Sequence, residues 1–239
     1  MITTSNEATL HIGKDSLLGK GSYGSVHRGT IHRKQYDKID VACKCQDLDD
    51  YLHEFRIFQF LSQEGGAPRS IVSLLDWCGD ENRILIFPLY KYSLTDCVKK
   101  PEYCTSVSFA KMVWDQLSQA LKWLHSKKNV SHNDISLDNA MLRDDTTVVL
   151  IDFGLAACCT EEPMSLPLDP CERVFTLKER CQEYGCKTGG YNSIPGRFGC
   201  QITALLRELW HALRIRYALA MVPCCETSRF KTQKIPAAW

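Results

Sequence analysis

Hydrophobic residues in the first third of the chain fall into short runs, each bounded by polar or glycine-bearing turns. Runs of this length that are closed by turn residues predict β-strands. Five of them lie at residues 17–18, 25–31, 40–45, 71–77 and 83–87. We therefore expect a five-stranded antiparallel sheet in this part of the chain.

A helical period interrupts these strands at residues 50–63. Apolar residues recur there at three- or four-residue spacing, which places them on one face of a helix, and Gly65-Gly66 ends the pattern. The expected face consists of Tyr51, Phe55, Phe58 and Leu61.

The clearest helical pattern covers residues 106–126, where one wide apolar stripe follows Ser106 or Ser108 as the N-cap. Two short strands are expected after it, at residues 140–142 and 148–151. A sheet-rich part followed by a mainly helical part is an α+β plan with two lobes. The crevice between the lobes is the expected ligand site.

The pattern weakens after Leu155. Residues 158–199 are rich in Cys, Pro, Gly and charged residues and show little periodicity. Residues 201–221 fit a helix, and residues 223–239 fit an irregular segment.

The composition of the chain argues against several classes of function. The formal net charge of the 239 residues is +1, so no overall field attracts nucleic acid or an anionic membrane. No run approaches the roughly 20 apolar residues of a spanning helix, and the first residues are polar, so we expect a cytoplasmic or nuclear protein. The 13 cysteines include no C-x-x-C pair, which favours free thiols over a zinc site.

A glycine-rich segment is the first candidate site. Three glycines within six residues let the backbone turn tightly and approach a phosphate. Dinucleotide-binding loops need a helix directly afterwards, whereas a β-type run follows here, so a strand–turn–strand phosphate loop is favoured over that class. An ordinary glycine hairpin is the alternative. The segment is Gly19, Lys20, Gly21, Ser22, Tyr23, Gly24, Ser25 and Val26.

Two charged residues are expected to face the interior. Lys44 ends the run Val41-Ala42-Cys43-Lys44, and a lysine that points inward from a strand needs an anion. Glu54 lies on the apolar side of the expected helix at residues 50–63 and is the candidate partner. An edge lysine and a solvated glutamate are the alternative reading of this pair.

Oxygen-bearing side chains gather between residues 132 and 154. Asp134 and Asn139 stand five residues apart, and Asp152-Phe153-Gly154 follows an apolar strand. Phosphoryl transfer needs a group that orients the acceptor and oxygen ligands for Mg²⁺. Asp134 fits the first role, and Asn139 and Asp152 fit the second.

The ordered set of these motifs resembles the protein kinase family, from about Leu17 to Gly154. The resemblance implies ATP and Mg²⁺ as cofactors and a protein hydroxyl as substrate. It implies Asp134, Lys44 and Glu54 as catalytic residues, Asn139 and Asp152 as metal ligands, Ile86 as gatekeeper and Phe153 packed against the glutamate helix. The implied ATP-binding residues are Gly19, Lys20, Gly21, Ser22, Tyr23, Gly24, Val26, Ala42, Lys44, Phe87 and Leu89.

The chain departs from the family pattern in three places. Asn133 replaces the arginine that precedes the catalytic aspartate, so control by a phosphate in the activation segment is not expected. Ser136 replaces the lysine of serine/threonine kinases, and Asp138 stands where tyrosine kinases have arginine. Ala-Pro-Glu does not follow Gly154 at the usual distance, so the second lobe is expected to be incomplete. Sequence degeneration and a misread frame both account for this last change.

These observations give the following expectations. A kinase-like domain covers residues 12–220, with the first lobe at 12–87, the conserved part of the second lobe at 93–157 and a divergent remainder at 158–220, before an irregular tail at 221–239. The expected function is transfer of the ATP γ-phosphate to serine or threonine hydroxyls. The alternatives are a pseudokinase that binds ATP or acts as a scaffold without turnover, and a fragment that does not fold. No nucleic-acid or membrane partner is expected.

Overall fold

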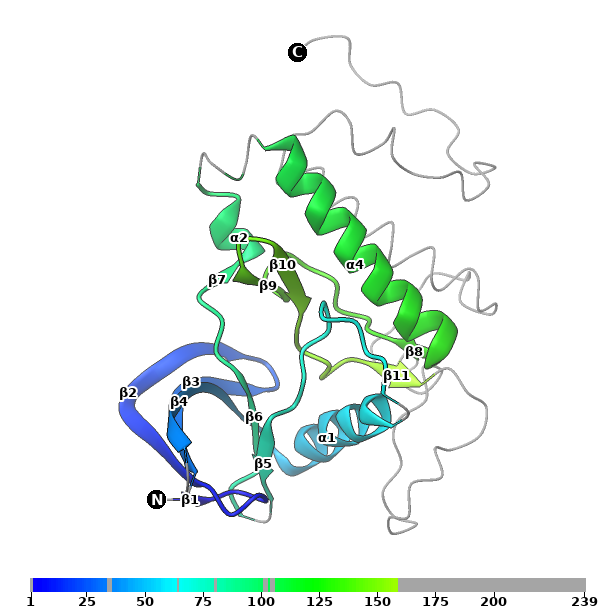
Figure 1. Cartoon of the computed structure of the whole chain (residues 1–239). Helices are drawn as coiled ribbons and strands as arrows, with labels where there is room; N and C mark the ends of the chain where they lie inside the picture. Colours follow the sequence, from blue (N-terminus) through cyan, green and yellow to red (C-terminus); the bar gives the residue numbers. More distant parts are fainter. Residues whose placement is uncertain are drawn as a thin grey trace.

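The structure is a computed structural model that describes residues 2–33, 36–63, 65–79, 81–100, 103 and 106–158. The expected helix at residues 201–221 and the expected tail lie outside the described residues, as does the divergent remainder apart from Cys158. Figure 1 shows a sheet and helix α1 in one lobe, and the long helix α4 with short strands and the short helix α2 in the other.

The first lobe contains a six-stranded sheet, not the five-stranded sheet expected from the sequence. All its paired strands are antiparallel, in the order β1-β2-β3-β4-β6-β5. The extra strand β1 has only two residues, too few to produce a period-2 pattern. The strands are β1 Ile2–Thr3, β2 Thr9–Gly21, β3 Gly24–Arg33, β4 Tyr36–Cys45, β5 Asp76–Cys78 and β6 Ile84–Pro88.

Strand β1 is held by a buried carboxylate. Asp76 is fully buried and accepts hydrogen bonds from Thr4 Oγ1 at 2.7 Å and Ser5 Oγ at 2.5 Å. The Ser5 amide also donates to the Trp77 carbonyl at 2.9 Å. These contacts fasten the start of the chain to β5, at the opposite edge of the sheet from β1 in strand order.

Helix α1 (Leu48–Ser62) lies within two residues of the expected helix and carries Asp49 and Asp50 in its first turn. Negative charge there is favoured by the helix dipole. Three of the four residues expected on its apolar face are buried, namely Tyr51, Phe58 and Leu61. Phe55 instead packs on the Trp77 ring, with 5.0 Å between the ring centroids.

The second lobe is organised around helix α4 (Val107–Lys127), where Ser106 Oγ accepts from the Phe109 amide at 3.1 Å as the N-cap. Its apolar stripe is buried against β10, β8 and neighbouring residues. The described part contains more strand than the mainly helical lobe that was expected. Its other elements are β7 Tyr92–Ser93, α2 Leu94–Cys97, β8 Val130–Ser131, β9 Ala140–Asp144, β10 Thr147–Leu150 and β11 Ala157–Cys158.

The expected strand at residues 71–77 divides between the lobes. Only its last part is strand β5, whereas Ile71 forms a parallel bridge with Leu150 at the end of β10. The Val72 amide donates to the Leu150 carbonyl at 3.0 Å, and the Leu150 amide donates to the Ser70 carbonyl at 2.8 Å. This connection joins the end of α1 to the second lobe.

Among the described helices, none has the length and apolarity needed to cross a bilayer.

Candidate active site

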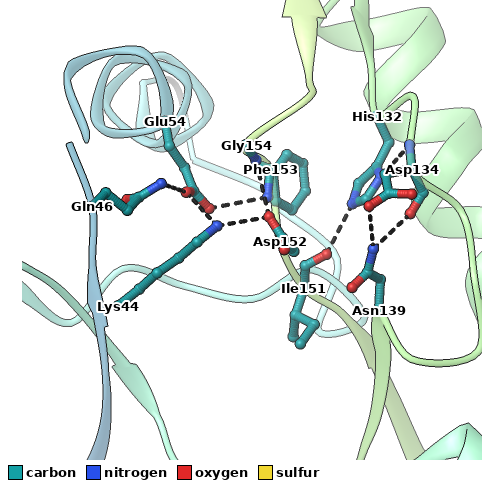
Figure 2. Close-up of polar contacts among 10 residues, drawn as sticks. All are labelled: Lys44, Gln46, Glu54, His132, Asp134, Asn139, Ile151, Asp152, Phe153 and Gly154. Carbon is teal, nitrogen blue, oxygen red and sulfur yellow. Dashed lines mark hydrogen bonds and ion pairs between the residues drawn. The ribbon is translucent and has the colours of Figure 1, made fainter. Parts of the chain in front are cut away.

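A lysine and two carboxylates meet between the lobes (Figure 2). Lys44 extends from β4, Glu54 from α1, and Asp152 from the segment after β10. Lys44 Nζ lies 2.6 Å from Glu54 Oε2 and 2.7 Å from Asp152 Oδ1. Burial alone would lower the pKa of Lys44, but the attraction of Glu54 and Asp152 raises it above the usual value. The lysine therefore stays charged at neutral pH.

Glu54 is fully buried, and each of its contacts comes from a donor. Besides Lys44, Gln46 Nε2 donates to Oε2 at 2.9 Å and the Phe153 amide donates to Oε1 at 3.1 Å. Burial raises the pKa of this carboxyl group and Lys44 opposes the rise. Three donors hold the group as a carboxylate. Gln46, which directly follows the end of β4, was not predicted from the sequence because it belongs to no motif.

Asp152 occupies an unusual backbone conformation, with φ at 62°. Its Oδ1 also accepts from the Gly154 amide at 3.1 Å. A Cβ at Gly154 would lie 3.2 Å from that same oxygen and 3.5 Å from Lys44 Nζ, so glycine leaves the space that the charged groups use. Burial would raise the pKa of Asp152, but Lys44 lowers it below the usual value. The side chain remains 39% exposed, and its bonds with Lys44 and Gly154 use only Oδ1, so this group is a candidate cation ligand.

Phe153 fixes the orientation of this segment. It is fully buried, and the centroid of its ring lies 5.2 Å from that of Phe58 on α1 and 4.7 Å from that of His132. The contact with Phe58 is the packing against the glutamate helix that the sequence predicted. Glu54 and Asp152 are thus held together through an aromatic contact as well as through Lys44.

Asp134 and Asn139 form a second group facing Asp152 (Figure 2). Asn139 Nδ2 donates to Asp134 Oδ2 at 2.7 Å and to the Asp134 carbonyl at 3.0 Å. This arrangement directs the Asn139 side-chain oxygen away from Asp134, where it can serve as a cation ligand. Burial raises the pKa of Asp134, and the hydrogen bond from Asn139 opposes that rise.

His132 ties this loop to the strand that precedes Asp152. Its Nε2–H donates to the Ile151 carbonyl at 3.0 Å, and its Nδ1 accepts from the Asp134 amide at 3.3 Å. The second contact requires the neutral ring, because a protonated Nδ1 cannot accept a hydrogen bond. Burial lowers the pKa of His132 to about 4, in agreement with that assignment.

The glycine-rich segment forms the β2–β3 hairpin, in which Gly21 pairs with Gly24. The glycines differ in what they need. Gly24 has φ at 142°, and a Cβ there would lie 2.2 Å from the Cys45 carbonyl, so its glycine is required for packing against β4. Gly19 and Gly21 have nothing within 4 Å of a built Cβ and leave an open surface. The structure thus shows the hairpin, and binding of phosphate beside Gly19 and Gly21 stays a prediction.

The strand register aligns the candidate nucleotide contacts. Val26 pairs with Lys44, and Ala42 pairs with Phe87. The Phe87 ring packs on Phe58 with 5.1 Å between centroids, so its side chain points toward the core. The sequence analysis missed Leu18, which is 53% exposed directly before Gly19. An apolar residue exposed beside a ligand loop is a candidate cover for a flat apolar ligand.

Two of the departures from the family pattern have a structural role. Asn133 has φ at 65°, and its Nδ2 donates to the Leu155 carbonyl at 2.9 Å. The Ser131 hydroxyl donates to the Asn133 side-chain oxygen. Ser136 Oγ accepts from the Asn139 amide at 3.2 Å and so closes the turn between Asp134 and Asn139. Both residues stabilise the loop through hydrogen bonds instead of supplying a cation.

The fold and this group of residues define a two-lobed kinase-type site. A family model described as Protein kinase domain matches residues 12–177, which is more than half of the chain. The chain therefore belongs to the protein kinase family.

Curated relatives include kinases of several kinds. The probable L-type lectin-domain containing receptor kinase S.5 of Arabidopsis thaliana is 29% identical, over 66% of this chain and 25% of the relative. Tyrosine-protein kinase Mer of Mus musculus is 30% identical, over 62% of this chain and 16% of the relative. The probable serine/threonine-protein kinase PBL28 of Arabidopsis thaliana is 28% identical, over 65% of this chain and 43% of the relative. The chain thus spans less than half the length of these relatives.

Proposed function

We propose that this chain is an active ATP-dependent protein kinase that phosphorylates serine or threonine. The observation that carries the proposal is the ion-paired trio of Lys44, Glu54 and Asp152, with the Asp134–Asn139 pair facing it. A scaffold would not need a buried lysine whose charge is balanced by two carboxylates beside a pair of oxygen ligands. We assign the kinase-like domain to residues 12–220, with its lobes divided at 87 and 93 and an irregular tail at 221–239.

The donor set fits Mg·ATP. Asp152 and Asn139 each offer a side-chain oxygen not used by Lys44 or Asp134, and hard oxygen donors suit Mg²⁺. Mg²⁺ bound there would neutralise charge on the transferring phosphoryl group. Lys44 would hold phosphate oxygens, kept in place by Glu54. The glycine-rich hairpin would cover the phosphates, and Val26, Ala42, Phe87 and Leu89 would surround the base.

Asp134 would act on the acceptor. Its raised pKa favours acceptance of a proton, and the bond from Asn139 fixes the carboxylate toward an incoming hydroxyl. The hydroxyl oxygen attacks phosphorus, the bond to the leaving diphosphate breaks, and the hydroxyl proton passes to Asp134. Asp138 in place of the arginine of tyrosine kinases favours serine and threonine over tyrosine.

The pseudokinase is the second candidate, and Ser136 is the observation that favours it. Its hydroxyl provides no charge for the transferring phosphoryl group, and removal of one such electrostatic donor typically lowers the rate about 10²- to 10³-fold. The activity expected here is therefore slow.

Measurement of Mg·ATP binding and phosphate transfer to a generic basic protein tests the proposal. The native chain is compared with Asp134→Ala and Lys44→Met. Transfer that disappears in both variants supports the kinase. Binding of Mg·ATP without transfer in the native chain would support the pseudokinase instead.

A further inference from the structure

Three cations and three tyrosines gather on the surface just beyond Pro88, outside the site described above. Lys100 Nζ lies 3.4 Å from the centroid of the Tyr92 ring and 5.9 Å from that of Tyr103. Lys91 Nζ lies 5.0 Å from the Tyr92 centroid. The third cation, Arg143, donates from Nη2 to the Tyr90 hydroxyl at 3.3 Å. We call Tyr90, Lys91, Tyr92, Lys100, Tyr103 and Arg143 the basic–aromatic cluster.

The register concentrates positive charge in this cluster. Strand β7 pairs with β9, with Tyr92 opposite Leu142, and Lys91 and Arg143 are the chain neighbours of these two paired residues. Like charges that lie close together repel each other. The lysine ammonium groups lower the pKa of the Tyr92 hydroxyl, first through hydrogen bonds from Lys91 and Lys100. The tyrosine rings ease the repulsion, but they do not neutralise the charge.

The nearby carboxylates are engaged elsewhere. Asp96 closes the capping box of α2 with Ser93 and lies 3.9 Å from Lys99. Asp144 Oδ1 accepts from the amide and the hydroxyl of Thr146 in the turn after β9. Lys91 and Arg143 are exposed, so their charges are accessible from solvent. Such a surface suits an anionic partner.

The cluster lies at a fixed distance from the candidate active site, because Tyr92 and Arg143 belong to β7 and β9, the paired strands beside α2 in Figure 1. Strand β9 begins directly after Asn139, and Arg143 is four residues along it. At about 3.4 Å per residue, this places Arg143 about 14 Å from Asn139. An extended peptide covers that distance in three to five residues.

We propose that the basic–aromatic cluster selects substrates whose acidic or phosphorylated residues lie three to five positions from the acceptor hydroxyl. This inference rests on the proposed function, because it assigns a preference to the same active site. Exposed pairs contribute little individually, but three acting together account for about a tenfold preference. The preference is electrostatic and weakens as salt shortens the Debye length.

The test uses peptides with a single serine in an otherwise neutral sequence. Glutamates occupy positions three to five on either the N-terminal or the C-terminal side, and glutamine replaces them in the control peptides. A further peptide carries one phosphoserine in place of the glutamates. Peptide binding is measured by fluorescence anisotropy without ATP, and kcat/KM is measured separately with Mg·ATP.

The triple variant Lys91→Glu, Lys100→Glu and Arg143→Glu is compared with a control of equal net charge. The control reverses Lys14, Lys122 and Lys127, which are exposed outside the cluster. Thermal melting of each variant checks that it folds. A second triple variant, Lys91→Arg, Lys100→Arg and Arg143→Lys, keeps the charges if the reversed one does not fold.

We expect an acidic peptide to bind about tenfold more tightly than its neutral form. This preference should be lost in the triple reversal and kept in both the control and the charge-conserving variant. A stronger response to phosphoserine than to glutamate would identify phosphate as the anion selected. Equal binding of acidic and neutral peptides, or an acidic preference that survives the reversal, would overturn the proposal. Binding of acidic peptides without phosphate transfer would support the cluster and refute the proposed function, whereas transfer without preference would do the reverse.

Discussion

Replacement of Glu54 by glutamine tests whether the buried ion pair stabilises this fold. Glutamine keeps the shape of the side chain, but its amide offers one oxygen where the carboxylate offers two. The carboxylate accepts from Lys44 and Gln46 on one oxygen and from the Phe153 amide on the other. In the variant, at least one buried donor therefore faces an NH₂ group.

The magnitude follows from these contacts. A buried donor left without an acceptor costs about 1–3 kcal/mol. A fully broken buried pair costs about 3–5 kcal/mol, but Lys44 retains Asp152 at 2.7 Å, which places the variant below that range. We expect Glu54→Gln to lower the free energy of unfolding by about 2 kcal/mol.

Urea unfolding provides the assay, since a shift in midpoint at constant slope reports stability. Asp49→Asn on the same helix is the control, because this residue is exposed in the first turn and should change stability by less than about 1 kcal/mol. Combining Glu54→Gln with Lys44→Met gives the coupling energy, which we expect to be about 1–2 kcal/mol. A Glu54 variant no less stable than the Asp49 variant, or strictly additive effects, would refute the reasoning.

Three further predictions follow from the site. Since burial holds the pKa of His132 near 4, protonation of the unfolded chain should remove up to about 3 kcal/mol of stability as pH falls from 6.5 to 4. In denaturant titrations at several pH values, the free energy of unfolding should depend less steeply on pH in His132→Gln than in the native chain. Ser136→Lys should raise kcat at least about tenfold over Ser136→Ala, and the alanine variant controls for the lost bond to the Asn139 amide. Equal kcat values in these two variants would show that the missing cation does not limit the rate. Gly24→Ala should destabilise the fold by several kcal/mol, whereas Gly21→Ala should change stability by about 1 kcal/mol or less. Similar melting temperatures for these two variants would contradict the different surroundings of the two glycines.

Periodicity predicted the elements that have long, one-sided apolar faces. Helices α1 and α4 lie within two residues of their expected bounds, because burial of a continuous stripe determines both. Strand β1 was missed because two residues carry no period, and its position depends on the side chain of Asp76, far away in sequence. The run at residues 71–77 is mostly apolar, with Ile71 and Val72 buried beside the second lobe and Asp76 at the start of β5, and apolarity alone does not show which lobe pairs with which residue.

The candidate site was predicted from motif spacing, and the structure brings Lys44, Glu54 and Asp152 into contact and pairs Asp134 with Asn139. Motif spacing did not predict a role for Gln46 or Leu18, since neither was part of a motif considered. Gln46 matters because it donates to Glu54, and Leu18 because it is exposed beside the glycine-rich segment. Motif spacing also assigned one role to three glycines that have different surroundings. The structural roles of Asn133 and Ser136 required atomic contacts, because the sequence indicated only which charges these positions lack.

The pairing of Ser70 and Val72 with Leu150 has a mechanical consequence. Leu150 is two residues before Asp152, and Ser70 follows shortly after the end of α1. The connection that follows α1 and the base of the Asp152 segment are therefore held to each other by backbone hydrogen bonds. We expect a displacement that withdraws Glu54 to be a rotation of α1 about its C-terminal end, which is nearer to this anchor along the chain. A small rotation about that end gives the largest displacement at the N-terminal end of the helix. Ligands that bind against the start of α1 should therefore have the largest effect on the Lys44–Glu54 contact.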